Sequence, residues 1–250
     1  MLATTKIYGC LADPINHVKA PSIFTSIFKE KNIDAVMVPI HVDKENLENV
    51  VDTLKKIKNF QGMTITIPHK TSISNLCDYL EEDAEFTQSV NWIKFDKDRK
   101  LIGNNFDGQG FVAGFLAQNF SIKNKKVCIF GAGGAAVSIA CSLVKQNIKS
   151  LKIVNRNVDK ANELTKKLKA IDNYLLVEVN RYEDNLLIND CDVIINATSL
   201  GLHQNDKLPF DVSKTSPKAV IADIIMQPLE TELLKQAKNL SRPVHYGNYM

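Results

Sequence analysis

The sequence predicts an α/β protein made of two domains. Short apolar runs alternate with amphipathic helical segments along all 250 residues, a pattern typical of βα units around a parallel sheet. This pattern begins again after about residue 106, and roughly 100–200 residues per domain leaves room for two. We therefore expect an N-terminal α/β domain at residues 1–106 and a C-terminal doubly wound parallel sheet at residues 107–250, with a cleft between them.

The first domain begins with an apolar strand near Lys6–Leu11, followed by a helix with Pro21 in its first turn, where proline is favoured. Later segments of this half also show the periodicity of strands and helices. They are a strand at Ala35–Ile40, a helix from about Asp43, a strand at Met63–Ile67, a helix from about Lys70, and a hairpin from Val90–Phe95 through 96–99 to Leu101–Ile102.

The second domain begins with a helix at Gly108–Gln118 and a buried strand at Lys126–Phe130. A glycine-rich turn at 131–136 then opens another helix. Further apolar runs predict the remaining strands of a parallel sheet, at Leu151–Val154, Leu175–Val179, Val193–Asn196 and Val220–Asp223.

The composition excludes several functional classes. The 31 Lys and Arg exceed the 28 Asp and Glu by only three and are scattered, so we expect no nucleic-acid partner. No apolar run approaches 18 residues, and the N-terminus lacks the pattern of a signal peptide, so we expect a cytoplasmic protein without membrane contact. The five cysteines form no C-x-x-C pair and predict reduced core thiols rather than metal ligands.

The turn G-A-G-G-A-A at 131–136 matches the dinucleotide-binding fingerprint G-x-G-x-x-G/A. It follows a predicted strand and opens a predicted helix, where backbone N–H groups hold a pyrophosphate. A tight strand-to-helix turn that needs small residues for packing remains the alternative. The residues expected to line the cofactor site here are Gly131, Ala132, Gly133, Gly134 and Ala135.

The end of the next strand indicates which dinucleotide is bound. NAD sites commonly place Asp or Glu there, whereas this strand runs into Asn155 and Arg156. A planar guanidinium suits a 2′-phosphate, and Asn155 and Lys160 add donors, so the sequence predicts NADP. The alternative is that Arg156 is a solvated residue at a strand end.

Lys70 and Asp107 are the candidate acid and base, because reduction of a carbonyl needs a proton donor and the reverse reaction needs an acceptor. Taken alone, each also fits a plain structural role, a surface lysine and a helix-capping aspartate. The sequence does not show that the two side chains meet.

Eight short motifs occur in order over almost the whole chain. They are D-P-I-x-H-x-K-x-P at 13–21, T-I-P-H-K at 66–70, V-N at 90–91, G-x-N-x-D-G at 103–108, G-A-G-G-A-A at 131–136, N-R at 155–156, I-N-A-T-S-x-G at 195–201 and D-x-x-x-x-P-x-x-T at 223–231. Together they resemble the shikimate dehydrogenase family.

The resemblance implies a substrate domain followed by a Rossmann-type NADP domain. It also implies reversible, NADP-linked reduction of 3-dehydroshikimate to shikimate, in the pathway to chorismate and the aromatic amino acids. Lys70 and Asp107 fall on the family's catalytic residues, and Asn91 falls on a substrate-binding asparagine. Residues implied on the nicotinamide side are Thr198, Ser199, Gly201 and Gly247, and Thr66 belongs to the lysine motif on the substrate side.

Several positions depart from the family on the substrate side. Val18 and Ala20 stand where the family has two serines that hold the substrate carboxylate, which leaves His17 or Lys19 as replacement partners. Thr64 replaces an asparagine, and Phe106 replaces a threonine. Met226 likewise replaces a tyrosine, and the family pattern continues past Met250 into a terminal helix that this sequence lacks.

These departures leave three hypotheses. The protein reduces 3-dehydroshikimate, or it acts on another ring acid, or it binds the cofactor with little turnover. In each case the expected partners are NADP and a small molecule, and we expect a monomer or a homodimer.

Overall fold

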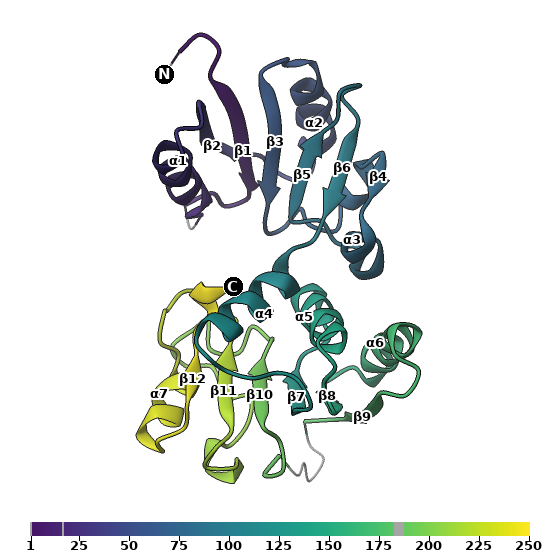
Figure 1. The fold of residues 1–250 in the computed structure, drawn as a ribbon, viewed down its shortest axis with the longest axis vertical. Helices are drawn as coiled ribbons and strands as arrows, with labels where there is room; N and C mark the ends of the chain where they lie inside the picture. Colours follow the sequence, from purple (N-terminus) through teal and green to yellow (C-terminus); the bar gives the residue numbers. More distant parts are fainter. Residues whose placement is uncertain (1, 17, 183–187) are drawn as a thin grey trace. The chain divides into compact units, whose positions relative to one another are not determined.

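The computed structural model describes residues 2–16, 18–182 and 188–250, and the chain divides into two compact units (Figure 1). The first unit is Met1–Phe106 and the second is Asp107–Met250. Each contains a six-stranded sheet with helices packed against it, so the predicted α/β class is confirmed.

The sheet of the first unit has the strand order β2-β1-β3-β5-β6-β4. Strand β1 pairs in parallel with β2 and β3, whereas β5 is antiparallel to both β3 and β6, so the sheet is mixed. Its strands are β1 (Lys6–Ala12), β2 (Ala35–His41), β3 (Phe60–Ile65), β4 (Tyr79–Leu80), β5 (Trp92–Phe95) and β6 (Leu101–Asn104). Its helices are α1 (Ala20–Glu30), α2 (Leu47–Lys56) and α3 (Glu82–Thr87).

Two helices predicted in this unit differ from the structure. Helix α2 begins at Leu47 rather than near Asp43, because the Asp43 carboxylate accepts the backbone N–H of Asn46 and holds a turn before the helix. The helix predicted from Lys70 is a short 3₁₀ helix, Ile73–Leu76. There the Ser74 hydroxyl donates to the carbonyl of Thr71 at 2.6 Å, which competes with regular helical pairing.

The sheet of the second unit is entirely parallel, with the order β12-β11-β10-β7-β8-β9. This is the strand order of a dinucleotide-binding doubly wound sheet, and the order reverses between β7 and β10. The strands are β7 (Lys126–Phe130), β8 (Ser150–Val154), β9 (Leu176–Asn180), β10 (Val193–Asn196), β11 (Val220–Asp223) and β12 (Val244–His245).

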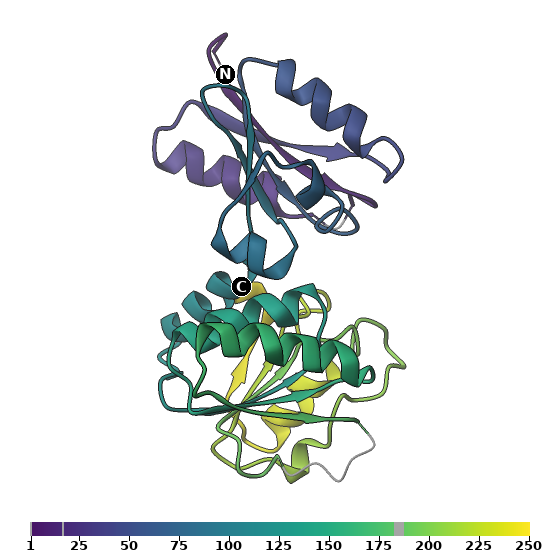
Figure 2. The same ribbon diagram turned by 90° about the vertical axis from the view of Figure 1, so that its right-hand side faces the viewer.

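Helices cover both faces of this second sheet (Figure 2). Helices α5 and α6 lie on one face, and α7 lies on the other. The helices are α4 (Asp107–Ala117), α5 (Gly134–Lys145), α6 (Val158–Ile171) and α7 (Glu232–Asn239), with 3₁₀ turns at Val212–Lys214 and Gly247–Tyr249. In the part of the chain that the structure describes, no helix combines the length and apolarity needed to span a membrane.

His245 on β12 is fully buried among aromatic rings of the second unit. Its ring centroid lies 5.0 Å from that of Phe111 and 5.2 Å from that of Phe115. Its Nδ1 lies 3.2 Å from the Gln118 side-chain oxygen, while Nε2 is buried without a hydrogen-bond partner. Burial lowers the pKa of His245 to about 4, so the ring is neutral in the native protein.

We expect His245 to make the protein sensitive to acid. Its pKa is lower in the folded chain than in the unfolded chain, so its contribution is complete above pH 6.5 and is lost as the pH falls toward 4. A shift of this size corresponds to about 3 kcal/mol. Urea unfolding of the wild type and of His245→Phe between pH 4 and 6.5 measures the free energy of unfolding at each pH. If this free energy falls equally steeply with pH in both proteins, the prediction is wrong.

Candidate cofactor and catalytic site

The turn after β7 has the geometry of a phosphate-binding loop. Gly131 has φ +112°, and a Cβ placed there would lie 2.7 Å from the carbonyl oxygen of Ala197, so only glycine fits. Gly133 is the N-cap residue of α5 and gives it no side-chain hydrogen bond, while a Cβ there would meet nothing within 4 Å. Open space in front of a bare helix N-terminus fits the pyrophosphate of a dinucleotide.

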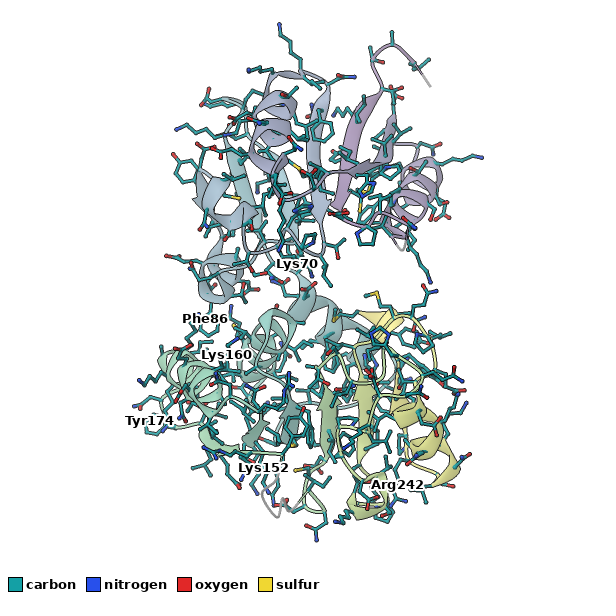
Figure 3. The ribbon with its side chains drawn as sticks, turned by 180° about the vertical axis from the view of Figure 1, so that it is seen from behind. Lys70, Phe86, Lys152, Lys160, Tyr174 and Arg242 are labelled. Carbon is teal, nitrogen blue, oxygen red and sulfur yellow. The ribbon has the colours of Figure 1, made fainter. Side chains whose placement is uncertain are left out.

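The strand end after β8 presents a positive group in the position expected for 2′-phosphate recognition. Arg156 is exposed, and the residues on either side of it are tied together because the Asn155 amide donates to the carbonyl of Asn157 at 2.8 Å. Asn157 in turn caps α6 by accepting the backbone N–H of Lys160, which is exposed in the first turn of that helix (Figure 3). The three residues Asn155, Arg156 and Lys160 therefore lie around one short turn.

The residues implied on the nicotinamide side follow β10 and β12. Thr198 is held by Asn196, whose side-chain oxygen accepts the Thr198 hydroxyl at 2.7 Å, and Ser199 beside it is exposed. Gly247 is buried, and a Cβ there would lie 2.5 Å from the backbone of Ile224. Both segments belong to the second unit and lie at the carboxyl end of the sheet, where ligands bind in folds of this kind.

Asp107 is buried in the first turn of α4. The next residue, Gly108, donates its N–H to the Ser138 hydroxyl on α5 at 2.8 Å. A Cβ at Gly108 would collide with the backbone of Ser138, so glycine is what lets the two helices cross this closely. This crossing fixes the start of α4 and therefore the position of Asp107.

Lys70 follows β3 in the first unit and is partly buried (Figure 3). Its carbonyl accepts the N–H of Val90 at 2.8 Å, which brings it beside Asn91. The side-chain oxygen of Asn91 accepts the N–H of Phe106 at 3.0 Å. Lys70 and Asn91 thus lie together at one end of the sheet, as a substrate site requires.

A buried histidine anchors the loop that carries Lys70. His69 is fully buried, and its Nε2 donates to the carbonyl of Val42 at 2.7 Å. Thr66 lies in the same loop, where its N–H donates to the carbonyl of Leu11 at 3.0 Å. The Lys70 loop is therefore tied to the ends of both β1 and β2.

The remaining substrate-side positions offer little polarity. Val18 is partly buried, and Ala20 begins α1, whose N-cap residue Lys19 makes no side-chain capping bond. Thr64 lies within β3 opposite Cys10, and its hydroxyl oxygen is buried without a hydrogen-bond partner. His17 lies outside the described residues.

Lys70 and Asp107 belong to different units, so their pairing stays a prediction.

Among the described residues, no group of three His, Cys, Asp or Glu side chains is arranged to hold a metal ion. The hydrogen bonds that join Asn196, Asp223 and Thr231, next to the residues implied on the nicotinamide side, were not predicted from the sequence. The spacing D-x-x-x-x-P-x-x-T was their visible signal, but that spacing alone assigns no role to Asp223.

Two family models match the chain. Residues 10–93 match the shikimate dehydrogenase substrate binding domain, and residues 115–226 match shikimate / quinate 5-dehydrogenase. A curated shikimate dehydrogenase (NADP(+)) from Methanosphaera stadtmanae is 37% identical over 249 residues, covering 98% of this chain and 87% of that protein.

Solved structures of relatives are also similar. A shikimate 5-dehydrogenase from Listeria monocytogenes, in complex with shikimate and NAD, superposes with a TM-score of 0.90 at 25% identity, covering 100% of this chain and 88% of that one. A 5-ketofructose reductase from a Gluconobacter species superposes with a TM-score of 0.88 at 29% identity, covering 98% and 88%. The similarity therefore extends over both units.

We expect Arg156→Ala to weaken NADPH binding by about 10- to 100-fold, because hydrogen bonds to a charged group contribute about 1.5–3 kcal/mol. NADH lacks the 2′-phosphate, so its affinity changes little. Fluorescence titration of both cofactors measures this. Lys169→Ala, which removes a positive charge from the other end of α6, is the control. Equal losses for the two cofactors, or equal affinity of the wild type for both, would contradict the role of Arg156.

Proposed function

The chain belongs to the shikimate dehydrogenase family, and from this premise we propose that it catalyses the reversible, NADP-linked reduction of 3-dehydroshikimate to shikimate. The first unit binds the ring substrate, and the second binds NADP. The observation that supports the proposal best is the backbone bond from Val90 to Lys70, which brings the loop of the candidate proton donor beside the segment that carries Asn91. The dinucleotide loop of the second unit binds NADPH, which is the hydride donor.

Bound NADPH supplies the hydride that reduces the carbonyl carbon. Lys70 and Asp107 act together as the acid–base pair. Lys70 donates a proton to the carbonyl oxygen as negative charge develops on it, and the same pair takes that proton back from the hydroxyl in the reverse direction. Asn91 donates hydrogen bonds that orient the ring, and Thr66 lies in the same loop as Lys70. The ketone, NADPH and one proton together give the alcohol and NADP⁺.

Within the second unit each part of the cofactor has its own residues. The loop 131–135 holds the pyrophosphate at the N-terminus of α5. Asn155, Arg156 and Lys160 hold the 2′-phosphate. Thr198, Ser199 and Gly247 line the nicotinamide side.

A second candidate function is reduction of a different ketone. The specific observation is that Val18 and Ala20 provide no hydroxyl at the start of α1, where the resemblance places the partners of the substrate carboxylate. A relative of the same fold is named a 5-ketofructose reductase. A substrate that is less polar at this position suits such a pocket. If NADPH binds and no ketone of a panel is reduced, the protein binds the cofactor without turnover.

The partners of this proposal are small molecules. The described cysteines are all free thiols, as a reducing compartment requires, and we propose a cytoplasmic monomer or homodimer.

We expect Lys70→Ala to lower kcat for 3-dehydroshikimate by about 10²- to 10⁴-fold, the usual contribution of a general acid. NADPH affinity stays unchanged because Lys70 lies in the other unit. Initial rates from NADPH absorbance and a fluorescence titration measure the two quantities. Lys58→Ala, an exposed lysine of the same unit, serves as the control. Retained turnover would remove Lys70 from this role.

We expect the double variant Val18→Ser with Ala20→Ser to lower KM for shikimate by about 10²-fold or more, because two hydroxyls can each donate to the carboxylate. KM for NADP stays unchanged. Ser22→Ala is the control, since this hydroxyl lies in the same turn and already donates to the carbonyl of Lys19. An unchanged KM for shikimate would show that these two positions do not face the carboxylate.

A further inference from the structure

One buried carboxylate lies among the three loops that follow β10, β11 and β12, of which the first and the last carry the residues proposed for the nicotinamide side. Asp223 ends β11 and is fully buried. One of its oxygens accepts the backbone N–H of Ile225 at 3.1 Å and the side-chain amide of Asn196 at 3.2 Å. The other oxygen accepts the hydroxyl of Thr231 at 2.8 Å. All three partners are neutral donors directed at one acidic group.

Asn196 extends this network into the loop after β10. Its amide also donates to the carbonyl of Leu200 at 2.9 Å. Its oxygen accepts both the N–H and the hydroxyl of Thr198, at 3.2 and 2.7 Å. Each hydrogen-bonding atom of the Asn196 side chain is thus engaged, so the shape of the loop that carries Thr198 depends on where Asp223 holds Asn196.

The third segment reaches Asp223 through packing. A Cβ at Gly247 would lie 2.5 Å from the backbone of both Ile224 and Ile225. Gly247 therefore rests directly on the segment whose N–H group Asp223 accepts. Thr231 completes the frame, because its hydroxyl also caps α7 by accepting the N–H of Leu234 at 3.4 Å.

A carboxylate suits this place because its two oxygens only accept hydrogen bonds. An asparagine amide has a single acceptor oxygen, so it would turn an NH₂ group toward one of the three donors. Burial raises the pKa of Asp223 to about 6 despite these hydrogen bonds, so the group is ionised above that pH and accepts all three.

We propose that Asp223 is a positioning residue that holds the nicotinamide half of the cofactor in place for hydride transfer, through Asn196, Ile225 and Gly247. The inference rests on the proposed NADP-linked function. The turn at Arg156 has its own hydrogen bond, and the N–H of Gly131 donates to the end of β8, so the adenosine half of the site is held mainly by bonds that do not involve Asp223. Loss of the carboxylate therefore affects the two halves of the cofactor differently.

The test separates these two halves with two ligands. NADPH spans the whole site, whereas adenosine 2′,5′-bisphosphate has no nicotinamide. Near pH 8 we expect Asp223→Asn to weaken NADPH binding by about 5- to 20-fold, the effect of one or two impaired hydrogen bonds, while bisphosphate affinity stays within about twofold. Loss of kcat should exceed any change in KM for the ketone, because small misplacements of reacting atoms cost about 10²-fold in rate.

A matched set of variants keeps the test sharp. Asp211→Asn is the control, since Asp211 also accepts a backbone N–H and a hydroxyl, those of Ser213, but caps a separate 3₁₀ turn. Thr231→Val, which removes the hydroxyl, should reproduce part of the Asp223→Asn effect. Thr231→Ser keeps the hydroxyl and should bind NADPH like the wild type.

Two outcomes would overturn the proposal. Equal weakening of both ligands would mean that Asp223 only stabilises the unit as a whole, and unchanged NADPH binding would mean that it holds nothing the nicotinamide needs. The binding measurements need no substrate. Failure of the wild type to reduce 3-dehydroshikimate would therefore count against the proposed reaction and leave the result for Asp223 intact.

Discussion

The backbone groups beyond the ends of parallel strands lack ladder partners, and most of the proposed cofactor-side residues lie shortly after such a strand end. The loops there need other hydrogen bonds to keep one shape. After β7 the N–H of Gly131 donates to the carbonyl at the end of β8. At the ends of β10 and β11 the side chains of Asn196 and Asp223 bond to each other and hold the loops that follow. Buried polar groups of this kind specify a single arrangement only when all are satisfied. The shape of these loops therefore depends on the hydrogen bonds of Asn196 and Asp223 as well as on the apolar core.

The sequence allowed much of the second unit to be predicted. Apolar runs predicted five of its six strands, and the glycine motif predicted the turn from β7 into α5. These features depend on local burial and backbone sterics, which the spacing of apolar residues and glycines in a sequence indicates directly. The bonds of Asp223 were not predictable, because they join residues 27 and 8 positions apart along the chain. Only the folded sheet brings β10, β11 and α7 together.

In the first unit local patterns were less reliable, and the reason is physical. The helix expected from Lys70 gave way to a 3₁₀ turn because Ser74 bonds the backbone of Thr71. That departure matters for chemistry. A regular helix would direct the carbonyl of Lys70 along the helix axis. In the observed loop this carbonyl is turned toward the residues just before β5 and accepts the N–H of Val90. The neighbour of Lys70 is thus Asn91, 21 positions away in sequence.

The proposed cofactor side and the proposed substrate side are held by different kinds of hydrogen bonds. On the cofactor side the frame of Asn196, Asp223 and Thr231 is buried and fully hydrogen-bonded, so a change at any member disturbs the others. On the substrate side the carbonyl of Lys70 accepts the N–H of Val90 and the side-chain oxygen of Asn91 accepts the N–H of Phe106, and neither bond involves positions 18 and 20 at the start of α1. Under the proposed function, side chains at those two positions change which ketone is accepted while the bond between Lys70 and Val90 is kept. Val18 and Ala20 are then compatible with the proposed roles of Lys70 and of the NADP loop, because neither role requires a hydroxyl at the start of α1.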